Sequence, residues 1–290
     1  MGATKKDGNT FVDLWHLTLY LIKLSRPRFW LYLAGPVLLA LVYSANSIAE
    51  LIDPFNIVYF LYFLIPANIF LYGVNDIFDA EIDEVNPKKT GREAVFRGST
   101  VTKAVIIISG VIGLAFLPYF ATVPKIALMA FYFLAVEYSA PPLRFKTTPI
   151  LDSVSNGLYV LPGIAVYLAL NTGVIPTGFI IGGWFWTMAM HTFSAVPDIE
   201  PDREAGISTT ATILGKQKTL IYCFIFWLFA SLSIATTSKT AALVTGIYPV
   251  LVIFIMIKEP DIDQVYWWYP YINGLLGMVL TLPGIWRLVY

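Results

Sequence analysis

Long apolar stretches, separated by short polar segments, run through most of the chain. A helix that crosses a bilayer takes about 20 mostly apolar residues, and nine stretches come near that length. Residues 11–25 are amphipathic instead, which predicts a helix lying along the membrane surface before the first span. We therefore expect an all-α integral membrane protein, with a cytoplasmic tail and interfacial helix over residues 1–27 and one polytopic domain over residues 28–290. The expected spans are 28–46, 55–78, 101–120, 123–141, 151–170, 175–196, 218–236, 239–257 and 266–287.

The composition agrees with a membrane protein. Hydrophobic residues make up 57% of the 290 residues and charged residues only 13%, which is about half the usual share in globular proteins. The net charge is zero, so the overall balance predicts no nucleic-acid partner. The single cysteine, Cys223, excludes an internal disulfide and any metal site built from several cysteines.

Positive charge orients the spans. With the N-terminus in the cytoplasm, every Lys and Arg falls in a cytoplasmic segment except Lys125, Lys239 and Arg287. Cytoplasmic loops of membrane proteins carry an excess of Lys and Arg, and a missed or added span would reverse every later loop. We therefore expect a multi-pass protein of the cytoplasmic membrane, with its N-terminus on the cytoplasmic side.

Carboxylates gather where the second span reaches the cytoplasmic side, in LYGVNDIFDAEIDEVNPKK over residues 71–89. Asn75, Asp79 and Asp83 are four residues apart, and each such step moves only about 40° round a helix, so the three share one face. Asp76 lies at the edge of that face. The span itself contains no Lys or Arg that could pair with these acids. Another positive group must therefore neutralise them.

A second acidic stretch, VPDIEPDREAG over residues 196–206, follows the sixth span on the same side. Asp198 and Asp202 are again four residues apart. Mg²⁺ prefers a few carboxylates, several waters and the phosphate oxygens of a substrate. The two stretches together therefore predict an Mg²⁺ site that holds a diphosphate. Either stretch alone could simply end a helix at the membrane surface, and that interpretation stays open for each.

Basic loops lie near both acidic stretches: KKTGREAVFRG over residues 88–98 and LRFK over residues 143–146. Their side chains could clamp phosphate oxygens. Basic loops could equally serve topology alone. The candidate diphosphate-binding residues are Arg92, Arg97, Arg144 and Lys146.

Three motifs resemble those of the UbiA-type intramembrane prenyltransferases. NDIFDAEID is similar to that family's NDxxDxxxD motif, PDIEPD to its DxxxD motif, and YSAPPLRFK to its Tyr-Ser/Thr-x-Pro-Pro-x-Arg-x-Lys loop. The resemblance covers nearly the whole chain and implies a nine-helix bundle with a central cavity and a cytoplasmic cap. It also implies that Mg²⁺ held by both acidic motifs binds an isoprenoid diphosphate. The metal ligands, or ligands to metal-bound water, would be Asn75, Asp76, Asp79, Asp83, Asp198 and Asp202.

The family pattern is not complete in the first basic loop. This chain has GREAVFRG where Arg-Pro-Leu is commoner, so Arg92 and Arg97 match the phosphate-binding positions more loosely than Arg144 and Lys146 do. The resemblance implies ionisation of an allylic C–O bond, with Mg²⁺ and basic groups stabilising the leaving diphosphate. The carbocation must then be kept from water, and aromatic faces attract cations.

A few residues near the motifs are candidates for the cavity and its chemistry. We expect catalytic roles for Asp79, Asp198 and Tyr138, and we expect Tyr72 in the substrate cavity because it also lies beside a motif. Two further polar residues, Asn68 and His191, each lie seven residues before a motif position, which returns near the same helix face. Each could line the substrate cavity, or could be a hydrogen-bonded structural residue.

Three longer strings resemble one branch of the family, the lycopene elongases: SRPRFWLYLAGP over residues 25–36, IPANIFLYGVNDIFDAEIDEVNPKK over 65–89, and AVPDIEPDREAGISTTAT over 195–212. The resemblance implies transfer of a five-carbon unit from dimethylallyl diphosphate to lycopene, in C50 carotenoid (bacterioruberin-type) biosynthesis. In the hydratase members, water then adds to the product cation.

Two other functions remain to be weighed. Prenylation of a polar acceptor, such as a glyceryl phosphate lipid or a quinone precursor, predicts cationic residues deep in the cavity, and the apolar spans offer none. A divalent-cation transporter would place its site near the membrane midplane. Here the acids gather on one side, and the outer loops have no matching acidic rows.

Overall fold

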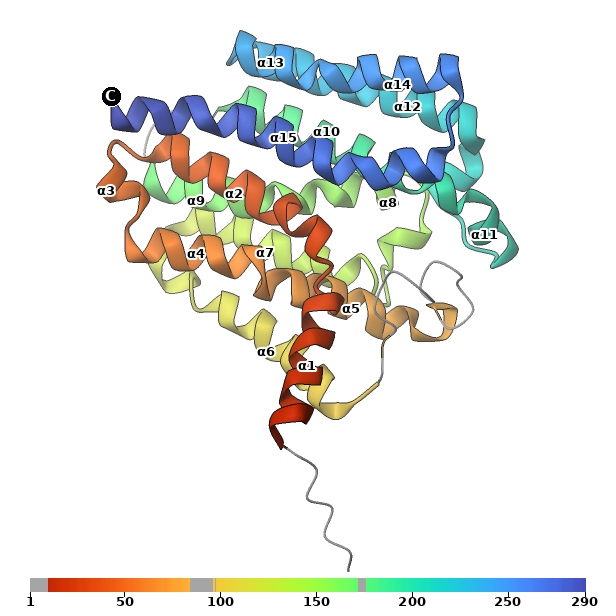
Figure 1. Ribbon diagram of the computed structural model, residues 1–290, viewed down its shortest axis with the longest axis horizontal. Helices are drawn as coiled ribbons and strands as arrows, with labels where there is room; N and C mark the ends of the chain where they lie inside the picture. The colour runs from red at the N-terminus through yellow and green to blue at the C-terminus, as the bar shows by residue number, and fades with distance from the viewer. Residues whose placement is uncertain (1–9, 84–95, 97, 172–175) are drawn as a thin grey trace, which may run out of the picture.

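The computed structural model describes residues 10–83, 96, 98–171 and 176–290. Within these residues every regular element is a helix, and no strand occurs among them. Many of the helices run roughly along one direction, whereas the N-terminal helix α1 runs across them (Figure 1). The elements are α1 (Thr10–Leu24), η1 (Pro27–Phe29), α2 (Trp30–Ser44), α3 (Ile48–Leu51), α4 (Pro54–Leu64), α5 (Pro66–Asp83), α6 (Thr100–Leu114), η2 (Leu117–Tyr119), α7 (Thr122–Glu137), η3 (Phe145–Thr147), α8 (Leu151–Val154), η4 (Ser155–Tyr159), α9 (Leu161–Leu170), α10 (Thr177–Ser194), η5 (Val196–Asp198), α11 (Ile199–Glu204), α12 (Thr210–Ala235), α13 (Lys239–Thr245), α14 (Ile247–Lys258) and α15 (Ile262–Val289).

Several stretches of the described residues are long and apolar enough to cross a membrane, as a multi-pass protein requires. They number six. The other three expected spans fall on α2, α7 and α10, which have 15, 16 and 18 residues. The arrangement of nine spans therefore stays a prediction. The six stretches are Pro54–Ala80, Thr100–Tyr119, Leu151–Leu170, Thr210–Ala235, Lys239–Lys258 and Ile262–Val289.

Some of these stretches are broken helices. The second expected span is divided between α4 and α5, because Pro66 lacks the N–H that would continue the hydrogen-bond ladder. The amide of Asn68 satisfies the carbonyls at this break: its Nδ2 donates to the oxygens of Phe63 and Leu64 at 2.9 and 3.0 Å. Backbone groups freed by a break inside a membrane need such partners.

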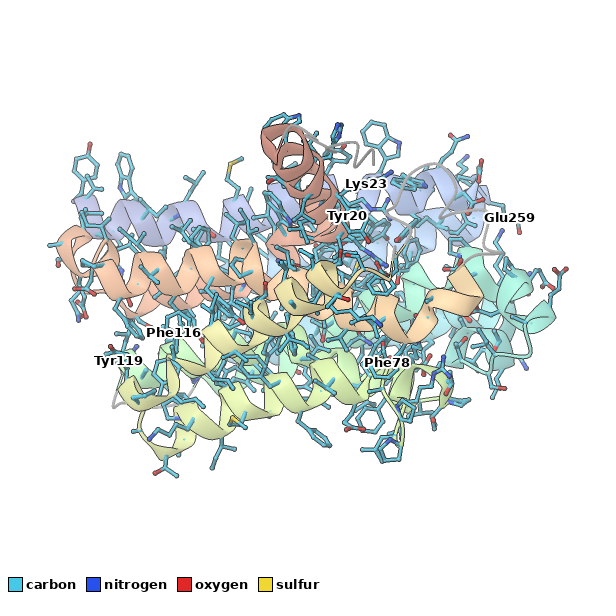
Figure 2. The ribbon with its side chains drawn as sticks, turned by 90° about the horizontal axis from the view of Figure 1, so that it is seen from below. Tyr20, Lys23, Phe78, Phe116, Tyr119 and Glu259 are labelled. Carbon is cyan, nitrogen blue, oxygen red and sulfur yellow. The ribbon has the colours of Figure 1, made fainter. Side chains whose placement is uncertain are left out.

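Helix α1 covers almost the range that the amphipathic pattern predicts. Its exposed side chains include Trp15, Leu19 and Ile22, which are large and apolar. The helix stands out from the side of the bundle near Tyr20 and Lys23, both labelled in Figure 2. A location at the membrane surface stays a prediction, as does the division at residue 27.

The buried apolar residues form two main clusters. The larger contains side chains from α2, from α4 to α7 and from α9, such as Phe63, Phe131 and Val166. The second contains side chains from α10, α12, α14 and α15, such as Phe193, Trp227 and Tyr269. Helix α10 packs along α12, whereas α9 packs against α2 and α7. The interior is thus divided between an earlier and a later part of the chain.

The two acidic motifs lie toward the same end of the bundle. The end of α5 and the short α11 are both at the right of Figure 1, whereas α3 is at the left. Figure 2 shows Phe78, which lies within the first motif, toward the end that carries Glu259, whereas Phe116 and Tyr119 lie toward the opposite end. The turn between α14 and α15 is therefore on the side of the acidic motifs.

Candidate active site

A cavity of about 340 Å³ opens between the two apolar clusters. Its walls come from the end of α5, from η1 and α2, from the loop after α7, from η4, from the end of α10 and from the start of α15. Its carboxylates, with Arg144 and Lys146, are called here the ionic part and come from α5, the loop after α7, η5 and α11. The rings of Tyr32, Tyr72, Tyr159 and Trp186 are called the apolar part. The cavity therefore combines an ionic part with an apolar part.

The first acidic motif sends two of its side chains into this cavity. Asn75 and Asp79 both line it. The Oδ1 of Asn75 accepts a hydrogen bond of 2.8 Å from the hydroxyl of Ser139. Asp79 forms an ion pair with Lys146, and Arg144 lies 3.5 Å from the same carboxylate oxygen. Asp83 is the last residue of α5, and its side chain lies outside the described part of the chain.

Asp76 points elsewhere. Its side chain is 1% exposed and does not line the cavity. Its Oδ1 accepts from Nη2 of Arg26 at 2.9 Å, and Arg26 also lies over the ring of Tyr72 at 4.7 Å from its centroid. The structure thus places Asp76 in a buried ion pair beside the cavity, and a role as metal ligand stays a prediction.

The second acidic motif approaches from the other cluster. Asp198 ends η5 and Asp202 lies in α11, and both line the cavity. Proline at positions 197 and 201 can begin a helix but cannot continue one, so α10 gives way here to two short helices. Arg203 turns away from the acids that line the cavity: it pairs with Glu200 at 2.8 Å and donates to the carbonyl of Thr212 at 2.7 Å.

The start of α12 fixes the end of this segment. Thr209 and Thr212 form a reciprocal cap at its first turn. The buried carboxylate of Asp152 accepts from the backbone N–H of Thr210 at 2.8 Å and also from its hydroxyl. An anion at a helix N-terminus is favourable, because the first N–H groups have no partners within the helix. Asp152 thus ties α8 to the chain that carries the second motif.

The loop after α7 brings two cations to the first motif. Arg144 and Lys146 both line the cavity. Backbone hydrogen bonds of 3.0 Å, from Arg144 N to Ala140 O and from Lys146 N to Tyr138 O, fold the loop back on the end of α7. The Nε of Arg144 is buried, with no hydrogen-bond partner among the described residues, so it retains a donor for an anion. Arg92 and Arg97 lie outside the described residues.

Of the other predicted cavity residues, Tyr72, Tyr138 and His191 line it, whereas Asn68 does not. The hydroxyl of Tyr138 lies 3.2 Å from Nε2 of His191, and that of Tyr72 lies 3.3 Å from the hydroxyl of Tyr159. Helix spacing placed Asn68 on the cavity face. The break at Pro66 instead directs its amide to the carbonyls before it.

Several lining residues were not predicted from the sequence. Arg26, Arg28 and Phe29 come from η1 and the residue before it. The guanidinium carbon of Arg28 lies 3.5 Å from the ring centroid of Trp267, and its Nη2 donates to the hydroxyl of Tyr266 at 2.9 Å. The string SRPRFW could have indicated these lining residues. Two arginines directly before an apolar span are typical of an anion-binding site as well as of a cytoplasmic loop. The remaining aromatic lining residues are Tyr32, Tyr159, Trp186, Tyr266 and Trp267.

The donor set fits a hard divalent cation. Asn75, Asp79, Asp198 and Asp202 bring only oxygen ligands to one cavity, which is the chemistry that Mg²⁺ prefers. Among the described residues, no three acidic, His or Cys side chains converge into a ready-made metal site. Mg²⁺ does not need one, because it usually keeps several waters and binds through one or two carboxylates and substrate phosphates.

Comparisons with known proteins agree on one family. The model of the UbiA prenyltransferase family matches residues 33–275. The chain is 52% identical to a lycopene elongase/hydratase of Haloferax volcanii, over 99% of this chain and 96% of that protein. It is 53% identical to one of Haloarcula japonica, over 93% and 92% of the two chains. The structure of a UbiA homologue from Archaeoglobus fulgidus bound to dimethylallyl diphosphate (DMAPP) and Mg²⁺ superposes with a TM-score of 0.66, covering 93% of this chain and 99% of that chain at 16% identity.

Proposed function

Because the chain belongs to the UbiA prenyltransferase family and is a prenyltransferase, we propose that it transfers the prenyl group of dimethylallyl diphosphate to lycopene in an Mg²⁺-dependent reaction. The observation that carries this proposal is the composition of one cavity. Both acidic motifs, two cations and a group of aromatic rings line it, in a chain more than 50% identical to haloarchaeal lycopene elongase/hydratases. The product would enter the biosynthesis of C50 carotenoids.

The ionic part of the cavity suits the diphosphate. Arg144 and Lys146 can donate to its oxygens, and the buried Nε of Arg144 offers a donor with no described partner. The carboxylates of Asp79 and Asp198, with Asn75 and Asp202, would hold Mg²⁺. Bound Mg²⁺ would neutralise the charge that develops on the diphosphate as its bond to carbon breaks. Lys146 and Arg144 also pair with Asp79.

The apolar part suits the carbocation. The allylic C–O bond breaks and its electron pair leaves with the diphosphate, so a positive charge remains on the five-carbon group. The rings of Tyr72, Tyr159 and Trp186 can face that charge and exclude water from it. The terminal double bond of lycopene then supplies the electron pair for the new C–C bond, which leaves a tertiary cation on the acceptor. No base is needed to activate an alkene.

The tertiary cation must then lose a proton or take up water. We assign the handling of this proton to Tyr138 and His191, whose side chains lie 3.2 Å apart in the cavity. If water adds, its oxygen forms the bond to carbon and its extra proton passes to the imidazole. If a proton leaves carbon instead, a new double bond forms. Uptake of water corresponds to the hydratase activity named for the haloarchaeal relatives.

The location follows from the charge pattern. We propose that the protein lies in the cytoplasmic membrane, with its N-terminus and the cavity mouth on the cytoplasmic side, where most of the Lys and Arg residues fall. A soluble diphosphate would then enter from the cytoplasm, whereas lycopene would arrive from the bilayer.

Expression in a bacterium that accumulates lycopene tests the proposal. The wild-type chain should convert lycopene into heavier C45 and C50 carotenoids, each carrying an added water where the hydratase reaction occurs. Asp79→Asn combined with Asp198→Asn should abolish them. Glu200→Gln is the matched control, since Glu200 is an exposed acid of the second motif that pairs with Arg203. Unchanged lycopene, with wild-type protein present in the membrane, would reject this acceptor.

A further inference from the structure

Three aromatic residues from three separate elements form one side of the cavity, called here the aromatic wall: Tyr32 of α2, Tyr159 of η4 and Trp186 of α10. The ring of Tyr32 meets the other two edge-on. Its centroid lies 6.2 Å from that of Tyr159 at 82°, and 6.4 Å from that of Trp186 at 78°. Edge-to-face packing is a favourable arrangement for such rings. The wall is therefore a packed unit, not three independent side chains.

A polar residue behind the wall holds it in place. Asn273 of α15 does not line the cavity, but its Nδ2 donates to the hydroxyl of Tyr32 at 2.8 Å. Its Oδ1 accepts from the hydroxyl of Tyr248 at 2.7 Å, and Tyr248 packs edge-on against Trp186 at 5.5 Å. One amide thus supports the wall on two sides. An amide within a membrane-spanning helix needs such partners, and they fix its orientation in turn.

The wall stands well away from the ionic part of the cavity. Trp186 precedes Ser194 by eight residues on α10, and both line the cavity. Eight residues of α-helix rise about 12 Å. Ser194 is close in the chain to the acidic Asp198, so the indole lies about two turns further from the acidic motif. A prenyl chain whose diphosphate is bound at the ionic part would extend toward the aromatic wall.

We propose that the aromatic wall limits the length of the prenyl donor to about five carbons, and that Asn273 is a positioning residue that keeps the wall closed. This inference rests on the proposed function, since it concerns the donor of that same reaction. A pocket that can extend gains affinity with each methylene it buries. A closed pocket does not, because a longer chain must displace packed rings.

Donor binding without any acceptor tests this directly. Purified full-length protein with Mg²⁺ is titrated with dimethylallyl, geranyl and geranylgeranyl diphosphates, and the thermal shift gives each affinity. For the wild type, affinity should not rise from five to ten carbons and should fall at twenty. Trp186→Ala should raise the affinity for geranyl diphosphate, relative to the five-carbon donor, by about tenfold or more. Trp186→Leu provides a second opening of the wall should the alanine variant fold poorly.

The role of Asn273 has its own variants. Asn273→Leu should shift the same ratio in the same direction, but less, because the rings stay in place without their hydrogen bonds. Asn273→Asp offers an acceptor oxygen to each tyrosine hydroxyl, with Tyr32 now donating instead of accepting, and should preserve the wild-type ratio. Trp268→Ala is the matched control, since Trp268 is an exposed ring on the same helix. General loss of folding would lower binding of all donors together and would leave the ratio unchanged.

Two results would overturn the length limit: wild-type affinity that rises steadily with donor length, or a ratio that Trp186→Ala and Trp186→Leu both leave unchanged. Absence of binding by every allylic diphosphate would overturn the proposed function and the length limit together. Binding that peaks at five carbons, without any product from lycopene, would support the length limit and reject only the acceptor.

Discussion

The guanidinium of Arg26 lies 2.9 Å from the carboxylate of Asp76, which is almost fully buried. Fifty residues separate the two in the chain, and their pairing joins the segment before α2 to the middle of α5. In the chain, Asp76 lies between Asn75 and Asp79, which both line the cavity. The side chain of Asp76 does not line it. We infer that it braces the first motif.

The first prediction concerns this ion pair. Arg26→Ala should lower the free energy of unfolding by about 3–5 kcal/mol, because it removes a cation that pairs with a buried carboxylate. The measurement is the thermal midpoint of the purified protein in detergent. Arg26→Lys keeps the charge and should recover part of the loss. A midpoint that Arg26→Ala leaves unaltered would show that Asp76 is neutralised by another group.

The second prediction concerns the cation that pairs with Asp79. Lys146→Ala should lower kcat/KM for the allylic diphosphate by about 10²–10³-fold, because a donor to the leaving group is lost. Steady-state assays with labelled donor measure this. Lys103→Ala is the control, since Lys103 is an exposed lysine on α6 away from the cavity lining. Equal, small effects of the two substitutions would remove Lys146 from the diphosphate site.

The third prediction concerns the fate of the product cation. Tyr138→Phe and His191→Gln should each lower the proportion of hydrated products relative to dehydrated ones, while lycopene is still consumed. Mass spectrometry of the pigments gives this ratio. Tyr222→Phe is the control, because that hydroxyl bonds Ser153 and does not line the cavity. An unchanged ratio of hydrated to dehydrated products would show that another group, such as the released diphosphate, takes the proton.

A fourth prediction concerns Asp152. Asp152→Ala should lower the free energy of unfolding by about 1–3 kcal/mol, because the buried N–H and hydroxyl of Thr210 lose their acceptor. The affinity for Mg²⁺ with donor should also fall, since the chain carrying Asp202 is no longer tied to α8. Denaturant titration and donor titration measure the two effects. Asp152→Asn retains one acceptor oxygen. Its free energy of unfolding and its affinity for Mg²⁺ with donor should therefore lie between those of Asp152→Ala and the wild type.

The fifth prediction concerns the metal. Addition of a chelator should abolish both donor binding and turnover, and Mg²⁺ should restore both. The reason is that the carboxylates of Asp79 and Asp198 carry the same sign of charge as the diphosphate and would repel it in the shared cavity. Binding of the donor that persists undiminished in excess chelator would contradict a metal held by these motifs.

Much of this arrangement could be predicted from local patterns. Apolar stretches predicted the helices, because a bilayer requires long runs of apolar side chains and every backbone group must be satisfied within them. Spacing within one helix placed Asn75 and Asp79 on a shared face, and both line the cavity. Such inferences succeed where the distance between residues is fixed by one regular element.

Other features depend on encounters between distant segments. The pairing of Arg26 with Asp76, and of Asn273 with Tyr32 across 241 residues, follows from how helices pack, which no local pattern specifies. For Asn68, by contrast, a local pattern was available but gave the wrong position. Its spacing from Asn75 was right for a helix, but the break at Pro66 offered its amide two nearby carbonyls. The carbonyls at the break need hydrogen-bond donors, and this need, not helix periodicity, decided where the Asn68 side chain points.

The division of the interior into two apolar clusters has a consequence for cooperativity. Asp79 and Tyr159 come from the earlier helices, whereas Asp198 and Trp186 come from the later ones, and all four line the cavity. A ligand that touches all four would contact both parts of the bundle. Binding of such a ligand would therefore stabilise both parts of the bundle against unfolding.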